Sequence, residues 1–186
     1  MITLGLDVST SKTGWCLLSS DGSLLKMGCV RLTEEGDLFY RAEHLATEIA
    51  RETAGIEEEI DVVIEEPLLR FARGMSSAST LLTLNRFNGM VTYACWKVLG
   101  VKPDHLNVIF ARRELGIKKG KGDNVKEVVM SWVAGDVPHH EWPTKTITRG
   151  VRKGQVIFED SCYDVADAYV MAKARFARRV KQDSRC

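Results

Sequence analysis

Residues 3–15 read TLGLDVSTSKTGW, and the rest of the chain can be organised around this stretch. The residues before Asp7 form an apolar run that is typical of a buried central strand. A second strand-like run follows at 15–18. An aspartate at the inner end of a central strand is costly to bury unless a cation offsets its charge. Asp7 therefore either ends a strand and caps a turn, or it binds a divalent metal ion.

Size and composition favour one domain with a substantial core, because the chain has 186 residues and is 45% hydrophobic. It contains no run of 18 apolar residues, so we expect no membrane span and no membrane partner. The amino terminus lacks a signal-peptide pattern, which predicts a cytoplasmic protein. The five cysteines are scattered and never in CxxC spacing, which argues against a disulfide framework and a zinc ribbon.

The charges are segregated along the chain although the net charge is only +1. Residues 31–66 hold twelve acidic against three basic residues, whereas residues 112–126 hold six basic against two acidic ones. Residues 145–155 carry four basic residues and no acid. A neutral protein with this pattern can present one cationic face to a polyanion such as nucleic acid. The alternative is a set of solvated helix faces.

The predicted elements alternate between strands and helices. The tight-turn signal Asp21-Gly22 joins two strand-like runs, so the first three strands are expected to form an antiparallel meander. The elements expected after it are a helix at 37–54, a strand at 60–64, a helix at 76–99, a strand at 105–110, a helix from 123 or 124 to 134, a hairpin-like insertion at 135–160 and a helix at 162–181. This order predicts a single α/β domain over residues 1–186.

Further acids stand where a site can form. Glu65-Glu66-Pro67 follows the fourth strand, and open α/β sheets place their sites at strand ends. In the last helix, Asp164 and Asp167 are three residues apart and therefore lie on one face. Helix capping accounts for Asp164 but explains Asp167 less well.

These side chains make an all-oxygen set, namely Asp7, Glu65 or Glu66, Asp164 and Asp167. Hard oxygen ligands suit Mg²⁺ or Mn²⁺ rather than zinc. Such a cluster beside cationic loops is the arrangement of two-metal phosphodiester hydrolysis. The sequence has no GxSxG motif and no P-loop, so neither a serine hydrolase nor a P-loop NTPase is indicated.

Three segments of the chain resemble the acidic motifs of RuvC-type Holliday junction resolvases, which belong to the RNase H-like superfamily. The segments are LGLDVSTSKTGW at 4–15, VVIEEPL at 62–68 and YDVADAYVMA at 163–172. The resemblance covers nearly the whole chain in order and spacing. It implies an RNase H-like α/β fold with a five-stranded mixed sheet, in which three antiparallel strands are followed by two parallel ones.

The resemblance also implies a function and a set of catalytic residues. Asp7, Glu65, Asp164 and Asp167 would be the catalytic acids and the ligands of two Mg²⁺ or Mn²⁺ ions, with Glu65 preferred over Glu66. The implied activity is paired nicking of four-way DNA junctions and other branched DNA by a homodimer, joined through the helix at 76–99. The protein would act in the cytoplasm, which is the host's cytoplasm if a phage encodes it.

Basic and apolar loop residues are the expected contacts with DNA. Those assigned to DNA are Arg70, Phe71, Arg73, Lys118, Lys119, Lys121, Arg149 and Lys153. By the resemblance, the loop at 68–74 lies near the junction centre, with Leu69 or Phe71 as a wedge between base pairs. The lysines of the glycine-rich loop and the basic residues of the insertion would contact phosphates.

The chain departs from the family pattern in three places, and alternatives follow. Glu66 adds an acid beside the expected Glu65. The usual DxGS after the first acid is here Asp7-Val8-Ser9-Thr10, without the glycine, and the insertion at 135–160 is longer than expected. One alternative is an RNase H-like enzyme that cleaves RNA in RNA–DNA hybrids. Another is an inactive branched-DNA-binding scaffold of the same fold. Sugar kinases and actin-like ATPases share a similar opening motif, but they need about twice this length and a second phosphate-binding turn.

Overall fold

A five-stranded mixed sheet forms the centre of the protein. The computed structural model describes residues 1–32, 36–67 and 77–184. The sheet has the order β3-β2-β1-β4-β5. Its strands are β1 Ile2–Val8, β2 Lys12–Leu18, β3 Leu24–Arg31, β4 Ile60–Glu65 and β5 Asp104–Leu106. The pairs β1–β2 and β2–β3 are antiparallel, and β1–β4 and β4–β5 are parallel. This confirms the predicted RNase H-like sheet.

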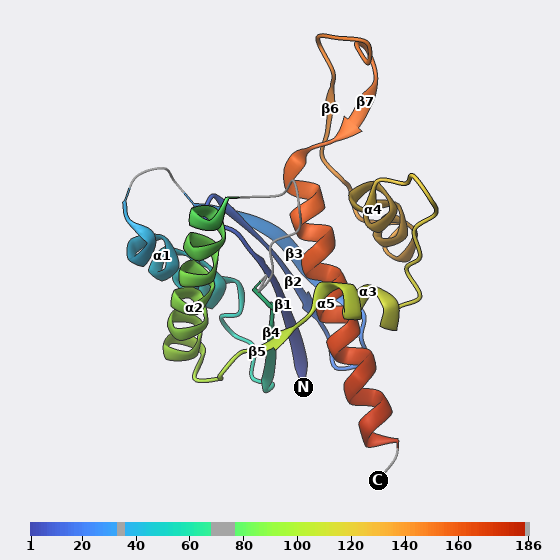
Figure 1. Cartoon of the computed structure of the whole chain (residues 1–186). Coiled ribbons are helices and arrows are strands. Elements are labelled where there is room, and N and C mark those ends of the chain that lie inside the picture. Colours follow the sequence, from blue (N-terminus) through green and yellow to red (C-terminus); the bar gives the residue numbers. More distant parts are fainter. Residues whose placement is uncertain (33–35, 68–76, 185–186) are drawn as a thin grey trace.

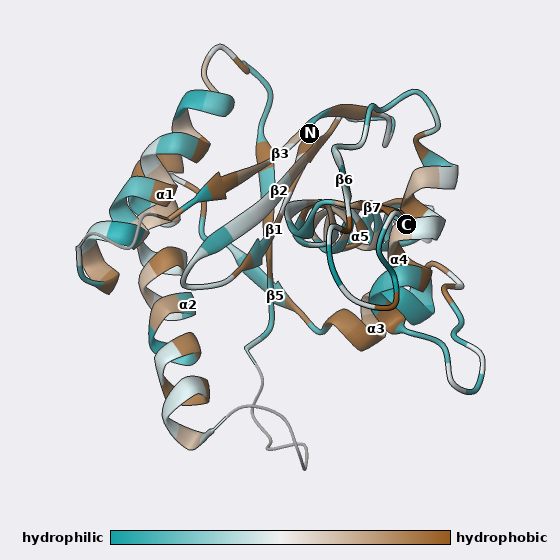
Figure 2. Cartoon of the chain, turned by 90° about the horizontal axis from the view of Figure 1, so that it is seen from above, coloured by the Kyte–Doolittle hydropathy of each residue, from teal (hydrophilic) through white to brown (hydrophobic). Residues whose placement is uncertain are grey.

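Helices cover both faces of the sheet, as Figures 1 and 2 show. Those of the described residues are α1 Leu38–Glu52, α2 Ala78–Leu99, α3 Val108–Glu114, α4 Val125–Asp136 and α5 Asp160–Asp183. Helices α1 and α2 lie on one face, and α5 lies on the other with α3 and α4 beside it. In the described part of the chain no helix is both long and apolar enough to cross a membrane.

The period-two alternation of the strands separates two hydrophobic cores. On β1, Leu4 and Leu6 pack into the core under α1 and α2. The residues between and after them, Gly5 and Asp7, therefore face α5. On β4, Val63 packs into the second core, so Glu65 also faces α5. Both strand-borne acids thus lie on the face that the last helix covers.

Two strand glycines allow α5 to pack directly on the sheet. A Cβ atom at Gly5 would lie 2.4 Å from the carbonyl oxygen of Ala168. One at Gly14 would lie 2.1 Å from the carbonyl oxygen of Asp164. Real Cβ atoms do not approach backbone so closely, so only glycine fits at these two positions. Because Gly14 pairs with Asp7 across the β1–β2 ladder, this contact brings the start of α5 beside Asp7.

The prediction of a strand at 105–110 was wrong for the second half of that segment. Strand β5 ends at Leu106, and the β-branched and aromatic residues that follow belong to helix α3. The side chain of Asn107 accepts hydrogen bonds from the backbone N–H groups of Ile109 and Phe110, at 3.0 and 3.3 Å. This N-cap starts the helix, and it outweighs the weak β preference of the residues after it.

The segment at 135–160 contains a two-stranded antiparallel hairpin. Its strands are β6 Thr144–Thr146 and β7 Val156–Phe158. The hairpin stands clear of the rest of the molecule, above the amino-terminal end of α5 (Figure 1). The loop at 68–74, with its predicted DNA contacts, lies outside the described residues, as does the first residue of the helix predicted at 76–99.

Candidate active site

The first two acids of the site come from neighbouring parallel strands. Leu6 of β1 pairs with Ile64 of β4, so the following residues, Asp7 and Glu65, stand next to each other at the carboxyl ends of their strands. Their side chains share a hydrogen bond. Two carboxyl groups can share one only if one of them carries a proton. Burial and the neighbouring carboxylate therefore favour the protonated form of Asp7.

The electrostatics of Asp7 indicate that each of the other three acids lies near it. Desolvation by the surrounding protein is the largest cause that raises the pKa of Asp7 well above its usual value. The charge of Glu65 raises this pKa further, and those of Asp167 and Asp164 add to it. Desolvation also raises the pKa of Glu65, whereas the guanidinium of Arg112 opposes the rise. The site thus concentrates negative charge around the end of β1.

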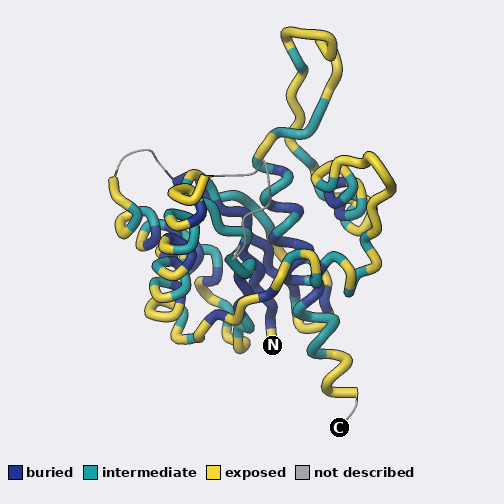
Figure 3. The backbone as a smooth tube through the Cα atoms, in the orientation of Figure 1, coloured by how far each residue is buried: buried dark blue, intermediate teal, exposed yellow. Residues whose placement is uncertain are grey.

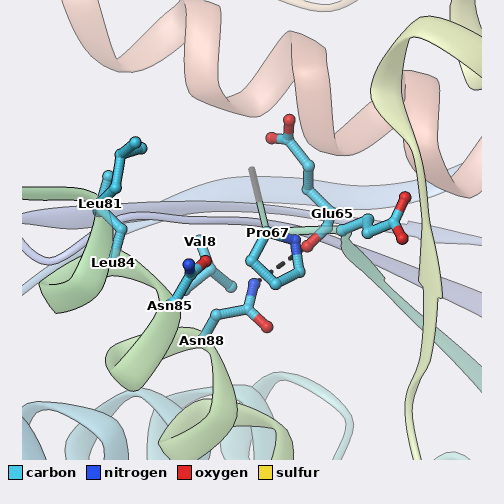
Figure 4. A pocket seen from close by; sticks show the side chains of 8 residues that line it. Val8, Glu65, Pro67, Leu81, Leu84, Asn85 and Asn88 are labelled. Carbon is cyan, nitrogen blue, oxygen red and sulfur yellow. Dashed lines mark hydrogen bonds between the residues drawn. The ribbon is translucent and has the colours of Figure 1, made fainter. Parts of the chain in front are cut away.

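A network from α2 fixes the backbone at the end of β4. Asn88 donates from Nδ2 to the carbonyl oxygen of Glu65 at 3.0 Å, and Figure 4 draws this bond. The Oδ1 atom of Asn88 is 3.0 Å from Nε2 of His105 on β5. The carboxylate of Glu66 points elsewhere and accepts a 3.3 Å hydrogen bond from Nδ2 of Asn107. The cavity beside these residues measures about 110 Å³ and also contacts Val8.

The two acids of α5 each have a cationic partner from another element. Nζ of Lys12, at the start of β2, lies 2.7 Å from Oδ2 of Asp164. Arg112, on α3, donates from Nη2 to Oδ1 of Asp167 at 2.7 Å. All four side chains are less than one-third exposed, so these ion pairs are screened less than surface pairs would be. The loop between β1 and β2 is held by the Ser9 hydroxyl, which donates to the Lys12 carbonyl at 2.6 Å.

The donor chemistry of the site fits a hard divalent cation, because all four groups are carboxylates. Burial, and after it the charges of the other three acids, raise the pKa of Asp7, and such an ion would offset both effects. The ligand sphere is not closed, however. Among the residues that the structure describes, no group of three or more such side chains is arranged to hold a metal ion. Lys12 and Arg112 engage Asp164 and Asp167 instead.

The predicted DNA-contacting residues fall into three groups. Lys118, Lys119 and Lys121 are exposed in the loop between α3 and α4. Arg149 and Lys153 are exposed on the β6–β7 hairpin. Arg70, Phe71 and Arg73, together with Leu69, lie outside the described residues.

Sequence reasoning missed several residues that shape the site. Lys12 drew no attention, and Arg112 was noted only as a basic residue after a strand. Their partners lie more than fifty residues away in the chain, so no local pattern reveals these ion pairs. Gly5 and Gly14 did carry a signal, since glycine inside an apolar strand indicates close approach of another backbone. Asn88 looked like an ordinary residue of a long helix.

Comparisons with known proteins bear on the fold. No family model matches the sequence, and no curated protein matches it. Among solved structures, RuvC of T. thermophilus in complex with a Holliday junction substrate superposes with a TM-score of 0.63 at 18% identity, over 97% of this chain and 96% of that one. A second T. thermophilus RuvC structure gives 0.61 at 19% identity, covering 97% of each chain.

A eukaryotic neighbour shares the same fold. The yeast mitochondrial Holliday junction resolvase Ydc2 gives a TM-score of 0.56 at 15% identity, over 97% of this chain and 80% of that one. Identities this low carry information about the fold alone. Together with the order and direction of the five strands, they show that this chain has the fold of the RuvC-type resolvases.

Proposed function

We propose that this protein is a divalent-metal-dependent endonuclease that cuts four-way DNA junctions and other branched DNA. One observation carries the proposal: Asp7 lies beside Glu65 and within electrostatic reach of both acids of α5, at the strand ends of a RuvC-type fold. Residues 1–186 would form a single nuclease domain, with the hairpin segment as an insertion.

The four carboxylates have distinct tasks in this proposal. Asp7, Glu65, Asp164 and Asp167 would hold two Mg²⁺ or Mn²⁺ ions, which supply an activated water molecule and stabilise the leaving 3′ oxygen. Cation binding would favour the ionised forms of Asp7 and Glu65 and so offset the rise in their pKa values. Asp164 and Asp167 would exchange Lys12 and Arg112 for the ions. The freed ammonium and guanidinium groups then lie close enough to the site to pair with DNA phosphate.

Exposed cations outside the acid cluster would hold the DNA. Lys118, Lys119 and Lys121 stand on a glycine-containing loop beside α3, which also carries Arg112. Their contacts with phosphates would give affinity without reading sequence. We also propose that Arg70, Phe71 and Arg73, in the loop at 68–74, contact the DNA near the junction centre.

The second copy needed for paired nicking would bind at α2. This helix exposes Tyr93 and Trp96, which are 60% and 48% exposed. Beside it, a groove of about 630 Å³ between α1 and α2 is lined mainly by apolar side chains, including Phe39, which is 69% exposed. Large apolar side chains gathered on one face are typical of protein interfaces.

The experiment that tests the proposal compares substrates and the Asp7→Asn variant. The unmodified protein should cut a four-way junction symmetrically with Mg²⁺ and should cut linear duplex far more slowly. Asp7→Asn should bind the junction with similar affinity and cut it at least a hundredfold more slowly, because the lost group is a ligand and not part of the core. Preferential cleavage of an RNA–DNA hybrid would replace the proposal with an RNase H-like activity.

A second candidate function is binding of branched DNA without cleavage. The observation that favours it is the engagement of Asp164 and Asp167 by internal cations, which leaves no closed metal site among the described residues. The same experiment separates the two functions. Junction binding by the unmodified protein, without cleavage in Mg²⁺ or Mn²⁺, would establish the scaffold role and reject the nuclease.

A further inference from the structure

The β6–β7 hairpin carries a concentration of positive charge that the fold itself does not use. Residues 144–158 contain four basic residues and no acid. Lys145 forms a 2.9 Å ion pair with Asp160 at the base. In the described part of the chain, Arg149, Arg152 and Lys153 form no ion pair with a carboxylate, and all three are exposed. Figure 3 shows how far this exposed ribbon stands from the buried centre.

The hairpin has a defined shape. Beyond its two strands, the backbone N–H of Ile147 donates to the carbonyl of Gln155 at 2.9 Å, and that of Gly154 donates back to Ile147 at 2.8 Å. The turn uses Gly150 and Gly154, which have φ values of 81° and 89°. Nε of Arg152 donates to Oε1 of Gln155 at 2.8 Å. These bonds make the basic tip a two-stranded ribbon.

The base of the hairpin is fixed to the helix that carries two of the catalytic acids. The rings of Trp142 and Phe158 pack edge to face, with centroids 6.4 Å apart. The carbonyl of Pro143 accepts hydrogen bonds from the N–H of Glu159 at 3.0 Å and from Sγ of Cys162 at 3.3 Å. The ribbon therefore projects from the first turn of α5, close to Asp164.

A groove extends from the hairpin base to Lys12, the residue that pairs with Asp164. It lies between the hairpin base and the ends of β2 and β3, has a volume of about 720 Å³, and is lined by Lys12, Arg31 and Lys145 as well as by the acids Glu159 and Asp160. The hydrogen bond from Lys145 and the charge of Lys12 both lower the pKa of Asp160, so both ammonium groups lie near that carboxylate. Lys12 in turn pairs with Asp164. Basic side chains therefore line a path from the hairpin, through Lys145 and Lys12, to Asp164.

We propose that the β6–β7 hairpin is a duplex-binding arm: it grips one double-helical arm of the branched DNA and guides that backbone along the groove to the acids. This inference rests on the proposed function. A two-stranded ribbon fits the major groove of B-DNA, and its unpaired cations would neutralise phosphates on either side. The four paired residues 144–147 of one strand reach about 13 Å, which spans about four base pairs.

The test uses a triple variant of the hairpin in the Asp7→Asn background, where binding is measured without cleavage. Arg149→Gln, Arg152→Gln and Lys153→Gln together should weaken junction binding at least tenfold and flatten the dependence of log K on log salt by about two to three units. The control removes three exposed cations at the opposite end of the sheet, by Lys26→Gln, Arg51→Gln and Lys102→Gln. Two of these, Lys26 and Arg51, pair with Glu52 and Glu48. The salt slope of the control should change by less than one unit.

Two further readouts locate the effect. Hydroxyl-radical footprinting should show that the hairpin variant loses protection over about four nucleotides of one duplex arm, while protection at the branch point remains. When the native Asp7 is present, the same three hairpin substitutions should raise KM. They should leave kcat within about twofold of the unmodified protein's value, because they lie outside the acid cluster. Circular dichroism and Tm should match those of the unmodified protein.

The outcomes distinguish this inference from the function on which it rests. If the hairpin variant and the control have equal affinity and equal salt slopes, the hairpin is not a duplex-binding arm, although the nuclease proposal stands. If the unmodified protein cuts junctions but its footprint ends at the branch point, the inference is likewise rejected. If no branched DNA is bound at all, both proposals are rejected together.

Discussion

At the scale of single residues, the site balances four acids with two internal cations. Burial and the charge of Glu65 raise the pKa of Asp7, and Asp164 and Asp167 are paired with Lys12 and Arg112. A carboxyl group whose pKa is raised by folding costs stability once the solution pH exceeds its pKa in the unfolded chain. The acid cluster should therefore be less stable at neutral pH than at low pH, unless divalent ions are added.

Asp7→Asn should make the metal-free protein more stable at neutral pH. The unfolded chain ionises Asp7 near pH 4, whereas the folded chain keeps the proton to a higher pH, so stability falls as the pH rises through this window. We expect the Tm of the variant to exceed that of the unmodified protein by about 2–4 °C at pH 7, the shift that about 1 kcal/mol gives in a domain of this size. Calorimetry across the pH range measures this difference.

The difference in Tm should vanish below about pH 4, where both states of the unmodified protein carry the proton. Adding Mg²⁺ should raise the Tm of the unmodified protein and have less effect on the variant, because ions that bind only the folded state stabilise it. A variant that is less stable than the unmodified protein at pH 7 would show that the buried carboxyl group of Asp7 does not destabilise the folded state.

At the scale of elements, the position of α5 decides whether the acids meet. The helix packs on the two strand glycines and is fastened at its other end by a charge cluster. Arg175 binds Asp61 with two hydrogen bonds of 2.7 and 2.9 Å, and Arg179 contacts the same carboxylate at 3.2 Å. These arginines looked like a solvated helix face in the sequence, yet they clamp α5 to β4.

Gly14→Ala should displace α5 and abolish the site. The added Cβ would lie 2.1 Å from the Asp164 carbonyl oxygen, so the helix must shift, at a cost on the order of 1–3 kcal/mol. Urea unfolding should show the lower midpoint, and junction cleavage should fall with it. Gly89→Ala is the matched control: nothing lies within 4 Å of its added Cβ inside α2, so it should be neutral or slightly stabilising. Unimpaired cleavage by Gly14→Ala would show that the α5 contact does not position the acids.

Particular residues show how much could be predicted from the sequence. The apolar run before Asp7 and the helical spacing of the last segment placed the acids on the right elements, because strand and helix periods are local properties. Val108 and its neighbours were misassigned, since their β preference lost to the cap at Asn107. The ion pairs of Lys12 and Arg112 join segments that lie far apart in the chain, and no local sequence pattern predicts such pairs.

At the scale of the whole molecule, the acid cluster and the apolar surface lie in different places. The acids stand at the carboxyl ends of β1 and β4 on the α5 face, whereas the groove beside α2 lies on the opposite layer (Figure 2). A dimer formed through α2 would leave both sites free to act on the two strands of a junction.

Substitutions on α2 should separate that dimer. Tyr93→Glu and Trp96→Glu together should convert the protein from dimer to monomer in light scattering, because both rings are exposed and form an edge-to-face pair with centroids 6.3 Å apart. Ile109→Glu, on α3, removes a side chain that is 72% exposed and serves as the control; it should leave the mass unchanged. A monomeric unmodified protein would refute the α2 interface.

The two ion pairs within the acid cluster have a further consequence for how the site is loaded. Four bare carboxylates would repel an incoming phosphodiester, and ions would then have to arrive first. With Lys12 and Arg112 already in place, half of that charge is offset from inside. In the proposed nuclease, DNA could therefore approach before any ion does, and the two could bind in either order.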